Sequence, residues 1–259
     1  MKIENPAFDY DNNKHDYAQV RRADKRIFSY VQSALVDFNT VINVGAGTGS
    51  YEPQDKYVIS VEPSSVMRKK RLALGRNPAI NAFADNLPFE DMSFDVSLAI
   101  LTIHHWPDLK AGLEEIKRVT RSKIVILTYD PERLADFWNV NYFPKVVEVE
   151  SKRYPVLGTI SSILGSTPKV SKIRIPFDCT DGFQEAFYGR PEFFLKEEVR
   201  QAQSAWGFID KDIEHEYVEH LRSDIQSGEW DRLYGFHREM PFFEGAYRML
   251  EFNLTDAST

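Results

Sequence analysis

The feature that most constrains this chain is a glycine-rich turn after one apolar run, followed by an acidic residue at the end of the next apolar run. Residues 41–49 read Val-Ile-Asn-Val-Gly-Ala-Gly-Thr-Gly, and residues 58–62 read Val-Ile-Ser-Val-Glu. Glycines have no Cβ, so the backbone can turn sharply and approach a ligand closely. A carboxylate at the end of the following strand can accept hydrogen bonds from both hydroxyls of a ribose. The pair therefore predicts a site for an adenosine-containing cofactor.

Apolar strands alternate with amphipathic helices over residues 23–128. Continuous apolar runs predict strands at residues 40–44, 57–62, 78–83, 94–101 and 123–128. Three-and-four spacing and turn signals predict helices over residues 17–38, from Ser64 or Ser65 onward, and from Pro107 and Asp108 to Val119. Continuous apolar strands are typical of parallel sheets buried on both faces. The alternation predicts right-handed crossovers, with ligands bound at the carboxyl ends of the strands.

The pattern changes after residue 130. Residues 131–164 are aromatic and irregularly helical, strands are expected at residues 169–175 and 246–252, and helices near residues 192–206 and 210–227. We expect one α/β domain over residues 1–259, with a mostly parallel seven-stranded sheet, helices on both faces, and a helical, aromatic-rich insertion before the last two strands. Its expected parts are a cofactor-binding core at residues 10–130, a substrate-covering insertion with the sixth strand at residues 131–245, and the last strand at residues 246–253.

The composition excludes several classes of protein. A chain of 259 residues that is 42% hydrophobic can bury one large core. A formal net charge of −7 argues against a nucleic-acid partner, because nucleic-acid domains usually present a basic face. Cys179 is the only cysteine, which excludes an intrachain disulfide, and no apolar run approaches the ~20 residues of a membrane span. The first residues also lack a signal-peptide pattern, so we expect a cytoplasmic enzyme without membrane insertion.

Five segments together resemble the S-adenosylmethionine-dependent methyltransferases of the seven-stranded, Rossmann-like class. They are residues 41–49, 58–62, 84–89, 94–96 and 103–108, in consistent order and spacing. The likeness covers about residues 10–130 and is greatest to the branch that contains quinone-biosynthesis and small-molecule methyltransferases. It implies a Rossmann-like fold, S-adenosylmethionine as cofactor, and methyl transfer to a small molecule.

The resemblance also implies which residues bind the cofactor. Gly45, Ala46 and Gly47 would pass under its methionyl part, Glu62 would hold the ribose, and Pro63 would border the adenine. The backbone of Ala84 and the side chain of Asp85 would meet the adenine edge, and the backbone of Ile100 and Leu101 would meet the amino group. Arg21, with Arg22 as the alternative, would reach the carboxylate while Tyr17 packs nearby. Many relatives carry an aspartate where this chain has Phe83, which leaves the adenine contact to Asp85 or to backbone.

Methyl transfer depends more on alignment and exclusion of water than on a reactive side chain. A hydroxyl or protonated amine acceptor also needs a base, and His104 and His105 follow the fourth expected strand. The alternative is that this pair only caps the next helix and packs beside Trp106. No histidine and carboxylate cluster has the spacing of a metal site, so we expect no metal.

The acceptor pocket is expected between the sheet edge and the aromatic region after Asp130. Trp138, Tyr142 and Tyr188 are the preferred substrate contacts, since each joins apolar area to a polar tip. The alternative is that these aromatic residues are ordinary core.

Two other functions share part of this pattern. A nicotinamide-dependent oxidoreductase would use the same strand, turn and acid, but Ser50 stands where its sixth-position glycine is expected. A non-catalytic binding protein could retain a cofactor site, although the intact glycines and Glu62 argue for use of that site.

Overall fold

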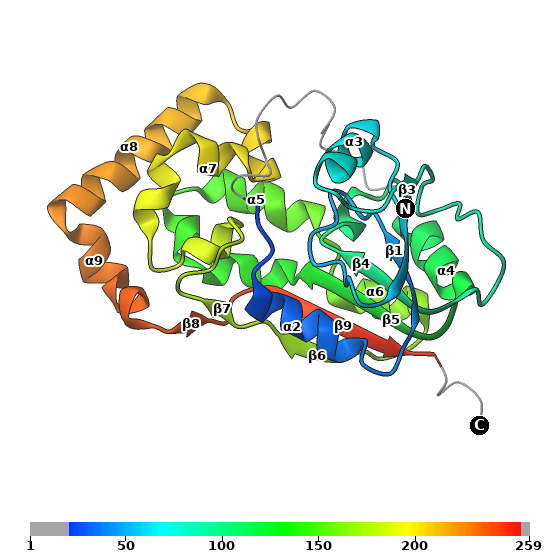
Figure 1. Cartoon of the computed structure of the whole chain (residues 1–259). Helices are drawn as coiled ribbons and strands as arrows, with labels where there is room; N and C mark the ends of the chain where they lie inside the picture. Colours follow the sequence, from blue (N-terminus) through cyan, green and yellow to red (C-terminus); the bar gives the residue numbers. More distant parts are fainter. Residues whose placement is uncertain (1–20, 255–259) are drawn as a thin grey trace.

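The computed structural model describes residues 21–254, in which a seven-stranded sheet forms the centre of the molecule (Figure 1). The strand order is β3-β2-β1-β4-β5-β9-β6. The strands are β1 (Thr40–Val44), β2 (Tyr57–Val61), β3 (Ala79–Ile80), β4 (Phe94–Ile100), β5 (Thr120–Tyr129), β6 (Lys169–Lys172) and β9 (Tyr247–Asn253). The first five strands pair in parallel, and β9 pairs antiparallel with both β5 and β6. This confirms the predicted Rossmann-like, mostly parallel α/β fold.

Two buried clusters sandwich the sheet. Alternate residues of β5 pack on opposite faces of the sheet. Val125 and Leu127 belong to one cluster, and Ile124 and Ile126 belong to the other. Helix α2 (Lys25–Ala34) covers the first side, whereas α4 (Leu109–Val119) and α6 (Leu157–Leu164) cover the second. All four β5 residues are fully buried, as the continuous apolar run predicts for a strand with two covered faces.

Elements that follow β5 in the sequence extend the first cluster beyond the end of the sheet, where Figure 1 shows α8 and α9. They are α5 (Pro144–Arg153), α7 (Glu197–Gln201), α8 (Lys211–Ser227), α9 (Glu229–Tyr234) and the two-stranded pair of β7 (Ile175–Pro176) and β8 (Phe242–Phe243). Seven 3-10 helices connect the described elements, among them η1 (Ile103–His105) and η4 (Gln184–Phe187). The aromatic residues of this region form one continuous core with the sheet, because the same cluster contains Trp138, Trp230 and Val125.

Several element boundaries differ from the sequence-based expectation. The helix expected over residues 17–38 spans only α2, because Asp24 accepts a hydrogen bond from the backbone N–H of Arg26 and caps it there. Residues 17–20 lie outside the described part. The strand expected at residues 169–175 is divided between β6 and β7. The helix expected near residues 192–206 is three short segments, η5 (Pro191–Leu195), α7 and η6 (Ser204–Phe208).

The elements expected near residues 192–206 and 210–227 do lie between the last two strands, whereas the insertion as a whole was expected before both. Residues 130–168 do precede β6, but residues 173–246 lie between β6 and β9, so the larger part separates the last two strands of the sheet. Among residues 21–254, no helix is long and apolar enough to cross a membrane, and no group of three or more histidine, cysteine or acidic side chains could hold a metal ion.

Candidate cofactor and acceptor sites

The glycine turn is attached to the end of the neighbouring strand. The backbone N–H groups of Gly45 and Ala46 both donate to the carbonyl oxygen of Val61, each at 2.9 Å. Gly45 and Gly47 have φ values of +69° and +51°, in the left-handed region where glycine carries no Cβ penalty. A Cβ on Gly45 would lie 1.9 Å from Oγ1 of Thr102, whereas a Cβ on Gly47 would meet open space. The turn therefore requires glycine and leaves Gly47 accessible.

Glu62 joins this turn to helix α3 (Ser65–Ala73). One carboxylate oxygen accepts the backbone N–H of Gly47 at 2.8 Å, and the other accepts that of Ser64 at 2.8 Å. Burial raises the pKa of Glu62, and these two backbone hydrogen bonds oppose the increase. Each carboxylate oxygen has a second lone pair, so Glu62 can still accept hydrogen bonds from a ligand.

A buried ion pair between Arg71 and Glu52 lies against the glycine turn. The Arg71 guanidinium is fully buried and donates to Glu52, whose other oxygen accepts from Asn43 and Ser60. A Cβ on Gly49 would lie 2.8 Å from Nη1 of Arg71. The network fixes the floor of the glycine turn through side chains of β1, β2 and α3.

The turn and Glu62 line the larger of two adjoining cavities, with a volume of about 620 Å³. Ten of the predicted site residues line it: Arg21, Gly45, Ala46, Gly47, Glu62, Pro63, Ala84, Ile100, Leu101 and His105. Asp85 does not line it and is half-buried, whereas Phe83, two positions earlier, does line it and is 54% exposed. Tyr17 lies outside the described residues. The structure therefore does not support the predicted contact between Asp85 and the adenine.

The end of β4 forms another wall of this larger cavity. Leu101 has a φ of +50°, a conformation that is costly for a leucine and that clusters at functional sites. Its N–H donates to the carbonyl oxygen of Leu127 at 2.8 Å, which holds the segment against β5. Trp106 packs on Gly112 of α4, where a Cβ would lie 2.5 Å from the indole. The wall is thus set by a strained backbone and a closely packed helix.

Arg21 lies between the two cavities and lines both. Its Nε donates to Asp181 at 2.6 Å, and the two residues also form a backbone bridge. Asp181 is buried and also accepts the hydroxyl of Tyr51 at 2.8 Å. The Arg21 side chain is therefore held at the cavity edge by a residue far along the chain.

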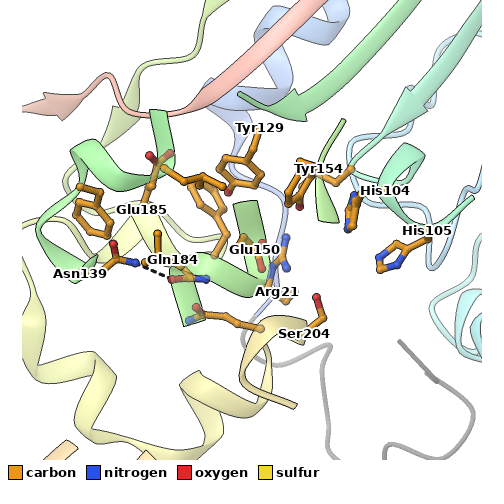
Figure 2. A pocket seen from close by; sticks show the side chains of 16 residues that line it. Arg21, His104, His105, Tyr129, Asn139, Glu150, Tyr154, Gln184, Glu185 and Ser204 are labelled. Atoms are coloured by element: carbon orange, nitrogen blue, oxygen red, sulfur yellow. Dashed lines mark hydrogen bonds between the residues drawn. The ribbon is translucent and has the colours of Figure 1, made fainter. Parts of the chain in front are cut away.

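The smaller cavity has a volume of about 60 Å³ and shares Arg21, Leu101 and His105 with the larger one. Figure 2 shows its labelled side chains, with His104 and His105 at one end and Asn139 and Glu185 at the other. The end with the histidines is the one that adjoins the larger cavity, since His105 lines both.

The two histidines are neutral at physiological pH. The His104 ring lies between those of His105 and Tyr154, with centroid distances of 3.9 and 4.1 Å. Burial holds the pKa of His104 well below its usual range, and burial together with the nearby Arg153 guanidinium lowers the pKa of His105 to about 3. Groups with such low pKa values are weak bases near pH 7. The structure therefore does not provide the histidine base with a near-neutral pKa that the sequence suggested.

Two buried carboxyl groups in the smaller cavity were missed by the sequence analysis. Burial raises the pKa of Glu150 and raises that of Glu185 to about 7. Oε2 of each has no hydrogen-bond partner within the described structure. Glu150 could have been noticed, because it lies three residues after the buried Val147 of α5 and three before the buried Arg153. No local pattern marks Glu185.

The three aromatic residues proposed as substrate contacts belong to the core. Trp138 donates its indole N–H to the carbonyl oxygen of Tyr188 at 2.8 Å, and the Tyr188 hydroxyl donates to that of Met240 at 2.7 Å. The Tyr142 hydroxyl donates to Asp224 at 2.8 Å. All three side chains are buried and line neither cavity. Their polar atoms already have hydrogen-bond partners inside the protein. These three residues are therefore part of the core, as the alternative interpretation held.

Comparisons with known proteins agree with this geometry. The family model for a methyltransferase domain matches residues 42–128. A solved structure from Anabaena variabilis, named as a candidate methyltransferase of an antibiotic biosynthesis pathway, is 31% identical with a TM-score of 0.83 and covers 91% of this chain and 100% of that one. The chain belongs to the S-adenosylmethionine-dependent methyltransferases.

More distant relatives share less of the chain. The malonyl-[acyl-carrier protein] O-methyltransferase of Halorhodospira halophila is 27% identical over 142 residues, which are 49% of this chain and 48% of that protein. The chain spans about half the length, or less, of the curated relatives it matches. A [4+2]-cyclase with 13% identity and a TM-score of 0.51, covering 88% of this chain and 79% of its own, shares the fold alone. Because one fold serves different reactions, the reaction must be argued from the site.

Proposed function

We propose that this chain transfers a methyl group from S-adenosylmethionine to a small-molecule acceptor. The observation that carries the proposal is the contact of Glu62 with Gly47 at the floor of a cavity of about 620 Å³. This cavity shares Arg21, Leu101 and His105 as lining residues with a second, smaller one. Two adjoining cavities are what transfer between a large cofactor and a small acceptor requires.

The residues of the larger cavity fit the cofactor. Gly47 leaves open space where a side chain would stand, and Glu62 retains lone pairs for the ribose hydroxyls. Phe83, exposed at the rim, offers a ring face on which an adenine can stack. Arg21 donates to Asp181 through Nε at 2.6 Å and through Nη2 at 3.5 Å, and its Nη1 is the group that would meet the carboxylate of the cofactor.

The chemistry divides between cofactor and protein. The bound cofactor supplies an electrophilic methyl group on a cationic sulfonium. Leu101 and His105 line both cavities and would hold the two reactants in line. The buried aromatic walls of the smaller cavity exclude water from the reacting atoms.

A proton lost by the acceptor would go to a carboxylate rather than to histidine. Glu150 lines the smaller cavity, and its Oε2 has no hydrogen-bond partner within the described residues, although Nη1 of Arg153 lies 3.9 Å away. Burial raises the pKa of Glu150, which makes its carboxylate a stronger base than an exposed one. His104 and His105 would shape the passage between the cavities as neutral rings.

The biological setting follows from likeness. Similarity along the whole Anabaena protein supports a role in secondary metabolism. A cytoplasmic location, a single substrate-covering insertion and the quinone-biosynthesis branch stay predictions.

The test is binding followed by transfer. Isothermal titration calorimetry of the full chain should detect binding of S-adenosylhomocysteine. It should detect no binding of NAD. Incubation with methyl-labelled S-adenosylmethionine and a small-metabolite extract should then label a low-molecular-weight product. Binding of NAD without S-adenosylhomocysteine, or binding without transfer to any metabolite fraction, would contradict the proposal.

A further inference from the structure

Buried oxygen atoms without partners gather around the smaller cavity. They are Oε2 of Glu150, Oε2 of Glu185, Oδ1 of Asn139, Oε1 of Gln203 and the hydroxyl of Tyr129, and all five residues line the cavity; the first four can only accept when the glutamates are ionised. The amide nitrogens of the asparagine and the glutamine are already used: Asn139 donates to Gln184 at 2.7 Å, and Gln203 donates to the carbonyl oxygen of Val199 at 3.1 Å. A buried acceptor without a donor costs about 1–3 kcal/mol. The walls therefore call for a ligand that brings hydrogen-bond donors.

Aromatic rings form another part of the cavity lining, which also includes the Arg21 guanidinium. Tyr129, Phe137, Tyr154 and Phe183 line the cavity, and the ring of Tyr129 lies edge-on to those of Tyr154 and Phe183, with centroid distances of 5.1 and 6.3 Å. The face of an aromatic ring attracts a cation, and more strongly where water is excluded. Carboxylates and ring faces together favour a positively charged organic group.

The charge that most lacks a counter-charge is that of Glu185. Its Oε1 accepts the backbone N–H of Ala246 at 2.6 Å, and no lysine or arginine within residues 21–254 forms an ion pair with it. The groups that face it electrostatically are Arg248 of β9 and the hydroxyls of Tyr129 and Tyr247. Arg248 donates to the carbonyl oxygens of Gly245 and Tyr247 instead.

The carboxyl group of Glu185 is also held in place. It belongs to the 3-10 helix η4 and is 1% exposed. A Cβ on Gly245 would lie 2.0 Å from its Oε1, so the chain approaches this carboxyl as closely as only glycine allows.

Glu150 differs from Glu185 in its surroundings. Nη1 of Arg153 lies 3.9 Å from Oε2 of Glu150, and that guanidinium donates to Ser204 at 2.7 Å. Arg21 also acts on Glu150 electrostatically while it donates to Asp181. Glu150 therefore has partial compensation, and Glu185, at the end of the cavity away from the histidines (Figure 2), has the stronger need of a cation.

We propose that the acceptor is a small organic amine, bound as its ammonium ion against Glu185, and that a second, nucleophilic group of the same molecule, not the ammonium nitrogen, lies toward Leu101 and His105, which line both cavities. This inference rests on the proposed function, since it assigns the substrate class of the same site. The cavity volume of about 60 Å³ holds roughly four to six water-sized groups, at 10–15 Å³ each, so the amine is small. An alcohol would leave Glu185 without a counter-charge, and a carboxylate would be repelled by it.

Proton release gives a direct signature of this contact. Burial raises the pKa of Glu185 to about 7, so the group is mostly protonated at about pH 6. An ammonium ion favours the ionised carboxylate, and binding must then release a proton. Calorimetry at about pH 6, in buffers of different ionisation enthalpy, measures the number of protons released. That number should be close to one per amine bound.

The experiment uses the full chain saturated with S-adenosylhomocysteine. Primary amines from ethylamine to phenethylamine are titrated, each beside the alcohol and the carboxylate with the same carbon skeleton. At least one amine should bind about tenfold more tightly than its alcohol, the effect of one charged hydrogen bond, and should release a proton. The inference is overturned if no amine exceeds its alcohol, if carboxylates bind best, or if amine binding releases no proton.

A matched pair of variants assigns the effect to Glu185. Glu185→Gln keeps the shape of the side chain and should bind S-adenosylhomocysteine normally while losing the advantage of amine over alcohol. Glu216→Gln, at an exposed position of α8, should keep that advantage. Retention of the advantage in Glu185→Gln would overturn the inference. Failure of S-adenosylhomocysteine to bind the native chain is a separate result, because it contradicts the proposed function itself.

Discussion

Replacing Glu185 with glutamine should stabilise the protein without ligand, and by an amount that depends on pH. Burial raises the pKa of this carboxyl from 4.5 to about 7 in the folded chain. The folded protein therefore holds a proton at pH values where the unfolded chain has lost it, and the free energy of unfolding falls as the pH rises through that window. At about 1.36 kcal/mol per pKa unit, the free energy of unfolding is lower by about 3 kcal/mol once the pH is above 7 and Glu185 is ionised in both states.

Glutamine has the same shape, keeps an acceptor for the backbone N–H of Ala246 and never ionises. The free energy of unfolding of the variant therefore does not fall with this ionisation. Its excess over that of the native chain should grow by about 2.5 kcal/mol between pH 5 and pH 8. Urea unfolding of both proteins at the two pH values measures this difference, in which all other titrating groups cancel. Glu216→Gln serves as the exposed control and should show no such growth.

An equal difference between Glu185→Gln and the native chain at pH 5 and pH 8 would refute this reasoning. That outcome would mean that Glu185 is solvated or paired in the folded protein, contrary to its 1% exposure. A decrease of the difference with rising pH would mean that a cation of the protein compensates the carboxylate.

Three further outcomes test other parts of the site. Glu62→Ala should weaken binding of S-adenosylhomocysteine by about 1–3 kcal/mol, the range of a hydrogen bond to a charged group, and unchanged affinity by calorimetry would remove Glu62 from the site. Gly45→Ala should lower the melting temperature markedly because its Cβ would lie 1.9 Å from Thr102, whereas Gly158→Ala, in open space on α6, should not; equal melting temperatures would contradict the steric clash. Tyr142→Phe should reduce stability by about 0.5–1.5 kcal/mol while leaving ligand binding unchanged, and weaker ligand binding would return Tyr142 to the site.

Much of the sheet was predictable because its signals are local. Strand β1 has the predicted limits, and α4 begins directly after Asp108, whose side chain accepts the N–H of Ala111. Apolar runs and capping residues act within a few positions, so they can be recognised without knowledge of the fold. The aromatic region was harder, because its short 3-10 segments have no regular period and are stabilised mainly by packing.

The larger cavity was also largely predictable, since parallel strands bring their carboxyl ends to one edge. Gly47 and Glu62 were expected together on this ground, and they form a hydrogen bond of 2.8 Å. Asp85 was not distinguishable in this way from Phe83, two positions before it, because which side chains of a loop face a cavity depends on the exact path of that loop.

The chain of amino acids alone determined the class of fold and the edge at which a cofactor would lie, because strand, turn and acid are close in sequence. Only the tertiary structure decided what the smaller cavity contains. Glu150 comes from α5 and Glu185 from η4, and long-range packing of the aromatic region brings both to one space. Packing also used the polar tips of Trp138 and Tyr142 within the core. Burial, which no local pattern specifies, is what turned two ordinary glutamates into carboxyl groups with raised pKa values.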